Sequence, residues 1–102
     1  MIKPIVDKAE VALEYPDKFY CGTFERSSRF EASFNSNGVA LVLERTGARD
    51  VRKSVHIHMH YGLFADFLEQ LAATASSVPQ DDVSYEHLKR AVSAFSRAIE
   101  KR

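Results

Sequence analysis

The sequence is short of residues on which several common kinds of protein depend. It has one cysteine, four glycines and three prolines in 102 residues. The single cysteine, Cys21, cannot form an internal disulfide, so we expect a reducing, cytoplasmic location. It stands in an apolar run and is predicted to be a small buried side chain. No apolar run approaches the roughly 20 residues of a membrane helix, and no cleavable signal is recognisable, so we expect no membrane partner.

An excess of charge of either sign is also missing. Lysine and arginine together number 14, as do aspartate and glutamate, so the formal net charge is zero. The molecule as a whole therefore has no strong attraction for nucleic acid or anionic lipid. With 45% hydrophobic and 27% charged residues, the composition is that of an ordinary globular protein. We expect one domain over residues 1–102.

Catalytic signatures are missing as well. The chain contains no G-x-S-x-G, no glycine-rich phosphate loop and no H-E-x-x-H, which are the local patterns of hydrolases, nucleotide-binding enzymes and zinc proteases. The adjacent acids Asp81 and Asp82 are more simply solvated charges or groups at a helix N-terminus. We expect a protein that is not an enzyme and needs no cofactor.

What the sequence does contain is a strand that continues directly into a helix, at residues 51–71. Val55, Ile57, Met59 and Tyr61 alternate with polar residues, which is the two-residue period of a strand with one apolar side. From Gly62 the apolar residues recur at the three- to four-residue spacing of a helix. The apolar side of this strand and the apolar stripe of this helix can bury each other, so we expect a sheet covered on one face.

Further strands precede this one at about residues 10–15, 19–26, 29–34 and 39–45, where apolar and polar residues alternate. Residues 4–15 leave an alternative open, because they also suit a short helix between Pro4 and Pro16. The sequence Asn35-Ser36-Asn37-Gly38 predicts a tight hairpin turn, since an Asn-Gly pair tolerates positive φ. Residues 1–6 are expected to fray. Residues 46–50 are expected to form the next loop.

The C-terminal part predicts two helices, at about residues 62–75 and 84–101, with Ser84 as the N-cap of the second. The predicted fold class is α+β: an antiparallel, four- or five-stranded meander sheet over about residues 10–61, followed by two helices packed on one face. The second helix completes that layer or packs on a partner chain. Because so small a sheet leaves much apolar surface, we expect a homodimer.

Three histidines, His56, His58 and His60, fall on the polar side of the strand in the 51–71 segment. Side chains four residues apart on a strand lie roughly 13 Å apart, so all three cannot ligate one tetrahedral metal ion. We interpret them as the polar face of a strand and predict no metal site. A metal site formed by two of these histidines together with His87 or a carboxylate remains an alternative.

Aromatic and basic residues are interleaved in the strands. Such residues grip single-stranded nucleic acid by stacking on bases and neutralising phosphates. The competing interpretation places the phenylalanines in the core and pairs the arginines with glutamates across strands. The aromatic residues are Phe19, Tyr20 and Phe24, and the basic residues are Lys18, Arg26, Arg29, Arg45, Arg49, Arg52 and Lys53.

Three short motifs over about residues 17–71, Lys18-Phe19-Tyr20, Arg29-Phe30 and Arg52-Lys53-Ser54, give the chain a family resemblance. In order and type they resemble the Pur-type, Whirly-type and positive-cofactor families of single-stranded nucleic-acid-binding proteins. The resemblance implies a curved antiparallel sheet with helices behind it, dimerisation through the helix, and nucleic acid crossing the open face of the sheet.

The sequence thus favours a small non-catalytic binding protein, with single-stranded DNA or RNA as the candidate partner. The alternatives are a homodimeric assembly subunit and a metal or small-molecule site on the histidine strand. The residues predicted to contact nucleic acid are Tyr20, Arg26, Arg29, Arg52, Lys53, His56 and His58.

Overall fold

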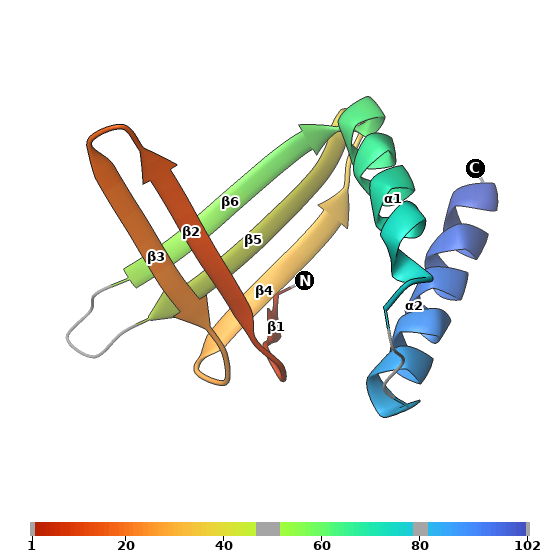
Figure 1. Ribbon diagram of the computed structural model, residues 1–102, viewed down its shortest axis with the longest axis horizontal. Helices are drawn as coiled ribbons and strands as arrows, with labels where there is room; N and C mark the ends of the chain where they lie inside the picture. The colour runs from red at the N-terminus through yellow and green to blue at the C-terminus, as the bar shows by residue number, and fades with distance from the viewer. Residues whose placement is uncertain (1, 47–51, 79–81, 102) are drawn as a thin grey trace. The chain divides into compact units, whose positions relative to one another are not determined.

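The computed structural model describes residues 2–46, 52–78 and 82–101. Within these residues the chain forms strands and then helices, an α+β fold with antiparallel strands, as predicted (Figure 1). The elements are β1 (Lys3–Pro4), β2 (Ala9–Tyr15), β3 (Lys18–Phe24), β4 (Ser28–Phe34), β5 (Gly38–Thr46), β6 (Arg52–His60), α1 (Tyr61–Ala75) and α2 (Asp82–Glu100). The loop expected at residues 46–50 lies outside the described residues, apart from Thr46, the last residue of β5.

The strands form two sheets rather than one continuous meander. The larger sheet has the order β1-β4-β5-β6, and β2 pairs with β3 in a separate two-stranded sheet. β4, β5 and β6 are consecutive antiparallel neighbours, so this part is a meander. The break comes between β3 and β4, where the short turn at Glu25–Ser28 is closed by a hydrogen bond from the Ser28 amide to the Glu25 carbonyl oxygen (2.7 Å).

The pairing register gives the larger sheet one apolar and one polar face. The apolar face is built from three rows of residues, each of which is paired directly across β4, β5 and β6. The rows are Phe30–Leu43–Val55, Ala32–Leu41–Ile57 and Phe34–Val39–Met59. The polar face carries Arg29, Glu31, Ser33, Glu44, Ser54, His56, His58 and His60 around the small residues Gly38 and Ala40. The alternation predicted for residues 51–61 is therefore confirmed from Ser54 to His60, whereas the side chains of Val51 and Arg52 lie outside the described residues.

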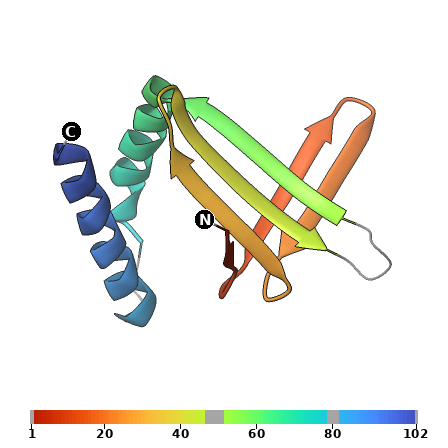
Figure 2. The ribbon, with the colours of Figure 1, turned by 180° about the vertical axis from the view of Figure 1, so that it is seen from behind.

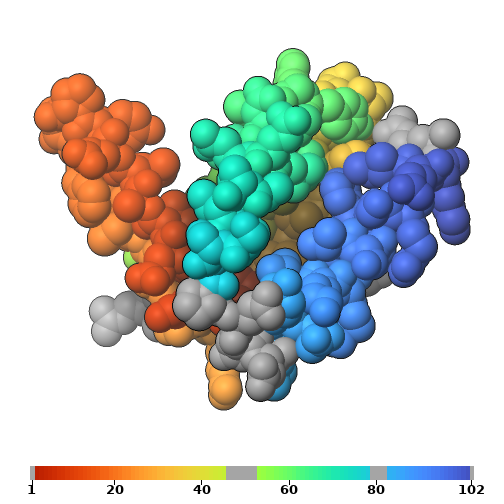
Figure 3. All heavy atoms as spheres, turned by 45° about the vertical axis from the view of Figure 1, so that its right-hand side comes forward, coloured from red at the N-terminus to blue at the C-terminus, as the bar shows by residue number. Residues whose placement is uncertain are grey.

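The β2–β3 hairpin crosses the apolar face of the larger sheet. Figures 1 and 2 show the hairpin in front of the sheet from one side and behind it from the other. The Arg45 guanidinium, on the apolar face, donates a hydrogen bond to the Thr23 carbonyl oxygen of β3 (3.3 Å). Phe24, at the same end of β3, is buried. The turn end of the hairpin stands clear of the rest of this part of the chain (Figure 3).

The first turn of α1 contacts the other end of the apolar face. The Phe34 ring lies 5.2 Å from the Tyr61 ring and 6.1 Å from the Phe64 ring, measured between centroids. The Tyr61 hydroxyl also donates a hydrogen bond to the Asn35 carbonyl oxygen. The sequence pattern assigned Tyr61 to the strand, but it is the first residue of α1. Its side chain contacts Phe34 and Asn35 at the end of the β4–β5 hairpin.

Two expectations at the N-terminal end are corrected. Residues 9–15 form a strand, so the alternative helix between Pro4 and Pro16 is wrong. Residues 3–5 do not fray: Lys3 pairs with Phe30, the Ile5 amide donates to the Ser28 carbonyl oxygen (2.9 Å), and the Ile5 side chain is buried. An apolar side chain that finds a buried position offsets the loss of chain entropy on ordering.

The chain divides into two compact units, Met1–Leu68 and Glu69–Arg102. In the second unit α2 begins at Asp82, so Ser84 is the third residue of the helix and not its N-cap. Leu88, Val92 and Ile99 are exposed along one stripe of α2.

Within the described residues, neither helix is both long and apolar enough to cross a membrane.

Few apolar side chains are buried in the part of the chain that the structure describes. Among the residues that the structure describes, these are Ile5, Phe24 and Val39. On the apolar face, Phe30, Phe34 and Ile57 remain 37%, 40% and 45% exposed. Many other large apolar residues in the described part of the chain also remain open, which makes the exposed apolar surface the most unusual physical property of this protein.

Candidate functional site

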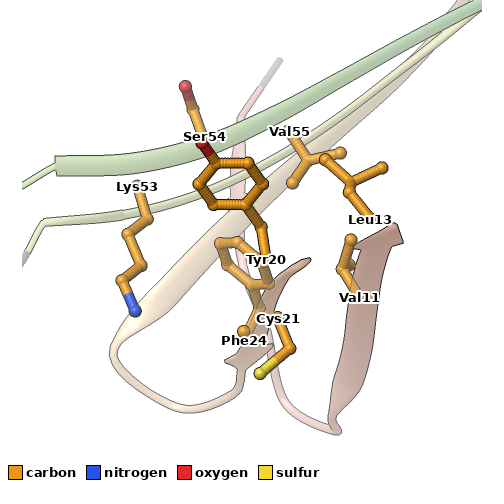
Figure 4. A pocket seen from close by; sticks show the side chains of 9 residues that line it. Val11, Leu13, Tyr20, Cys21, Phe24, Lys53, Ser54 and Val55 are labelled. Atoms are coloured by element: carbon orange, nitrogen blue, oxygen red, sulfur yellow. The ribbon is translucent and has the colours of Figure 1, made fainter. Parts of the chain in front are cut away.

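An open cleft of about 420 Å³ lies between the hairpin and the β6 edge of the larger sheet. Its size is within the range of small-ligand pockets. The apolar part of the lining comes from both sides, with Val11, Leu13 and Phe24 on the hairpin and Val55 on β6. Figure 4 shows Leu13 and Val55 facing each other across it. Residues of β2, β3 and β6 line the cleft together, so it depends on the hairpin lying beside the larger sheet.

The polar residues that line the cleft are Tyr20, Cys21, Lys53 and Ser54. Tyr20 and Lys53 are labelled among them in Figure 4, whereas the pairing register places the Ser54 side chain on the polar face of the larger sheet. The side chains of Tyr20 and Lys53 are both exposed, Tyr20 by 53% of its surface. An aromatic ring next to an ammonium group can stack on a flat apolar group and attract an anion at the same time.

Further aromatic residues continue from the cleft to the tip of the hairpin. Tyr15 and Tyr20 lie on the same hairpin face with ring centroids 6.3 Å apart in an edge-to-face arrangement. Phe19 is on the opposite face of the hairpin and is 62% exposed. Lys18 stands next to it, directly opposite Tyr15 in the strand pairing. The tip therefore presents aromatic rings on both of its faces.

The polar face of the larger sheet has a different electrostatic character. Arg29 lies directly opposite Glu44, and Glu31 is in the neighbouring row with Val42 and His56. Among the described charged side chains of this face, one is basic and two are acidic. A phosphate chain crossing it would therefore meet more repulsion than attraction from these side chains.

The residues predicted to bind nucleic acid do not form one surface. Tyr20 and Lys53 share the cleft, whereas Arg29, His56 and His58 lie on the polar face of the sheet. Arg26 is in the β3–β4 turn, beside a second hollow that Asp7, Lys8 and Glu25 also line. The side chain of Arg52 lies outside the described residues, although its backbone pairs with Thr46.

The histidine strand brings two imidazoles together. The His58 and His60 ring centroids are 5.6 Å apart with an interplanar angle of 80°. His56 is on the same face, one row further along. In the described residues, no group of three or more His, Cys, Asp or Glu is placed to hold a metal ion.

Two features of the site were not recognised in the sequence. Cys21 is exposed rather than buried, and it is one of the residues that line the cleft. Val11 and Leu13 line the cleft, and the alternation of residues 10–15 already marked them as one face of a strand. The sequence carried no signal that this face of β2 would lie against β6 of the larger sheet.

Comparison with protein-family models, with curated proteins and with solved structures finds no match to this chain. The candidate site is therefore interpreted from its own geometry.

Proposed function

We propose that this protein is a non-catalytic binding module that acts as a homodimer. The observation that carries the proposal is the open apolar face of the larger sheet, on which Phe30, Phe34 and Ile57 are each more than a third exposed. Fully burying one such side chain stabilises a protein by about 1.5–3 kcal/mol. A surface of this kind on a small domain is a contact surface.

A second copy of the same chain suits this surface because the chain carries no net charge. Self-association brings like molecules together, and a large net charge would oppose it by repulsion. Here that barrier is absent. In a two-fold dimer, the same patch of each copy forms the interface, so the apolar face of one copy covers the apolar face of the other.

The test is the molecular mass in solution over a range of protein concentrations. Sedimentation equilibrium should give the mass of two chains at high concentration and a shift toward one chain on dilution. The free energy of unfolding should rise with concentration in parallel, because the partner stabilises only the folded state. A one-chain mass at every concentration would contradict the proposal.

A second candidate function is the binding of single-stranded nucleic acid. It is supported by one specific observation, the exposed aromatic residues Tyr15, Phe19 and Tyr20 beside Lys18 and Lys53. Stacking on such rings is worth about 1–3 kcal/mol per base and does not depend on sequence. In this proposal the nucleic acid runs along the hairpin and its cleft, where Lys18 and Lys53 lie, and not across the polar face of the larger sheet, whose described charged side chains are mostly acidic.

Fluorescence anisotropy with mixed-sequence single-stranded DNA and RNA tests this candidate. Binding should be micromolar, weaken as salt is raised and exceed binding to duplex, because phosphate contacts release counterions while stacking needs unpaired bases. Absence of binding at low salt would remove the candidate and leave the dimer proposal untouched.

A further inference from the structure

We propose that His58 and His60 form a binding site for a divalent transition-metal ion of the zinc, nickel and copper class. The site is independent of both functions proposed above. It rests on the contact between two imidazole rings on a regular strand, and on the lack of bulky neighbours around them.

The geometry of the two rings is close to that of a metal chelate. A zinc ion lies about 2.0–2.1 Å from each ligand nitrogen, which puts each ring centre roughly 3.2 Å from the ion. At a tetrahedral angle the two ring centres are then about 5.2 Å apart. The observed separation is 5.6 Å, so the two ring centres are already about as far apart as those of a chelate, and binding requires side-chain rotations that turn one nitrogen of each ring toward the shared ion.

The backbone holds this pair in place. His58 pairs with Ala40 and His60 with Gly38, so both histidines stand on a continuous part of the β5–β6 ladder. Strands present functional groups with more precision than loops do. Both histidines are exposed, and a methyl group and a hydrogen are the only side chains opposite them. The remaining coordination positions of a bound ion therefore face solvent and can take water.

The surroundings do not oppose a cation. Arg29 is on the same face but belongs to the row of Glu44 and Ser54, two rows beyond His58. The row of His56 lies between the row of Glu44 and the row of His58. His56 and His60 cannot ligate the same ion, since strand residues four positions apart are separated by roughly 13 Å. The imidazole pair favours zinc, nickel and copper over magnesium and calcium, which prefer oxygen ligands.

The experiment is calorimetric titration of the full chain with Zn²⁺, Ni²⁺ and, for comparison, Mg²⁺. We expect micromolar binding of Zn²⁺ and Ni²⁺ and none of Mg²⁺. His58→Ala and His60→Ala should each weaken binding roughly tenfold or more, because each removes one of two ligands. Acidification should also weaken binding, since protons compete for the imidazole nitrogens.

Three matched variants control for other ligands. His56→Ala changes the neighbouring histidine on the same face, His87→Ala changes the histidine of α2, and Cys21→Ser removes the exposed thiol. All three should bind Zn²⁺ as the natural chain does. In ¹⁵N–¹H NMR spectra, the ion should perturb residues 57–61 and their β5 partners, and the same spectra report whether each variant is folded.

The proposal is overturned by any of three results. These are absence of Zn²⁺ and Ni²⁺ binding to the natural chain, undiminished binding to a folded His58→Ala/His60→Ala double variant, and an equal loss in the His56, His87 or Cys21 control.

Discussion

Gly38, the first residue of β5, lies against the backbone of Met59 in β6. A Cβ atom added at Gly38 would overlap the Met59 carbonyl oxygen and crowd the Cα of His60. No left-handed φ accompanies this glycine. The hairpin predicted from the Asn-Gly pair is present, but Gly38 is required for close approach between strands and not for a positive φ.

Gly38→Ala should therefore lower the free energy of unfolding by about 1–3 kcal/mol, the usual cost of forcing an extra carbon into a packed region. Urea denaturation followed by circular dichroism measures it. Gly62→Ala is the matched control, because nothing lies within 4 Å of a Cβ added there and the residue is helical. That variant should be as stable as the natural chain or up to about 1 kcal/mol more stable. Equal effects at both glycines would contradict the explanation.

Asn35 closes the turn between β4 and β5. Its side-chain oxygen accepts hydrogen bonds from the amides of Asn37 and Gly38, each at 2.9 Å. Asn35→Ala should destabilise the protein by about 1–2 kcal/mol, since each such bond is worth roughly 0.5–1.5 kcal/mol. Ser36→Ala, at the next position of the same turn, should change stability by less than about 0.5 kcal/mol. Thermal unfolding of the two variants side by side decides the matter.

The proposed dimer predicts opposite results for two adjacent residues of β6. Ile57 is on the apolar face and His56 on the polar face. Ile57→Lys should shift the monomer–dimer equilibrium toward monomer by about tenfold or more, because burial of a charge costs more than an isoleucine contributes. His56→Lys should leave the equilibrium within about threefold of the natural chain. Sedimentation equilibrium provides both values, and a dimer insensitive to Ile57→Lys would place the interface elsewhere.

The nucleic-acid candidate predicts which face of the protein is used. Tyr20→Ala should weaken binding by about 1–3 kcal/mol through loss of one stacked base. Lys53→Ala should weaken it for every sequence and reduce the slope of its salt dependence by about one. Arg29→Ala, on the polar face of the larger sheet, should have little effect. The reverse pattern in anisotropy titrations would assign nucleic-acid binding to that polar face.

Local patterns predicted most of this fold. The change of period near Gly62 located the junction of β6 and α1 to within one residue, because the spacing of apolar residues directly reflects backbone geometry. The same alternation separates Lys53 from His56 and His58, since successive residues on a strand point to opposite faces. The sequence pattern alone therefore excludes one binding surface that contains all three residues.

Long-range packing was beyond the sequence. The hairpin residues Leu13 and Tyr20 were recognisable as one face of a strand pair, but their meeting with Val55 depends on how the hairpin crosses the larger sheet. The order of Ile5 likewise depends on Ser28, which is distant in the chain. Such contacts are tertiary and leave no periodic signal.

β6 is the last strand in the order of the larger sheet, and in the described chain it pairs only with β5. In antiparallel pairing, the amide and carbonyl of one residue point to the same side, and those of the next residue point to the other. Every second amide of β6 therefore has no strand partner in the described chain and should exchange its hydrogen rapidly, while the others should be protected by β5. His56, His58 and His60 share one parity, so their three amides belong to the same exchange class. Amide exchange along this strand should have two rates that alternate residue by residue.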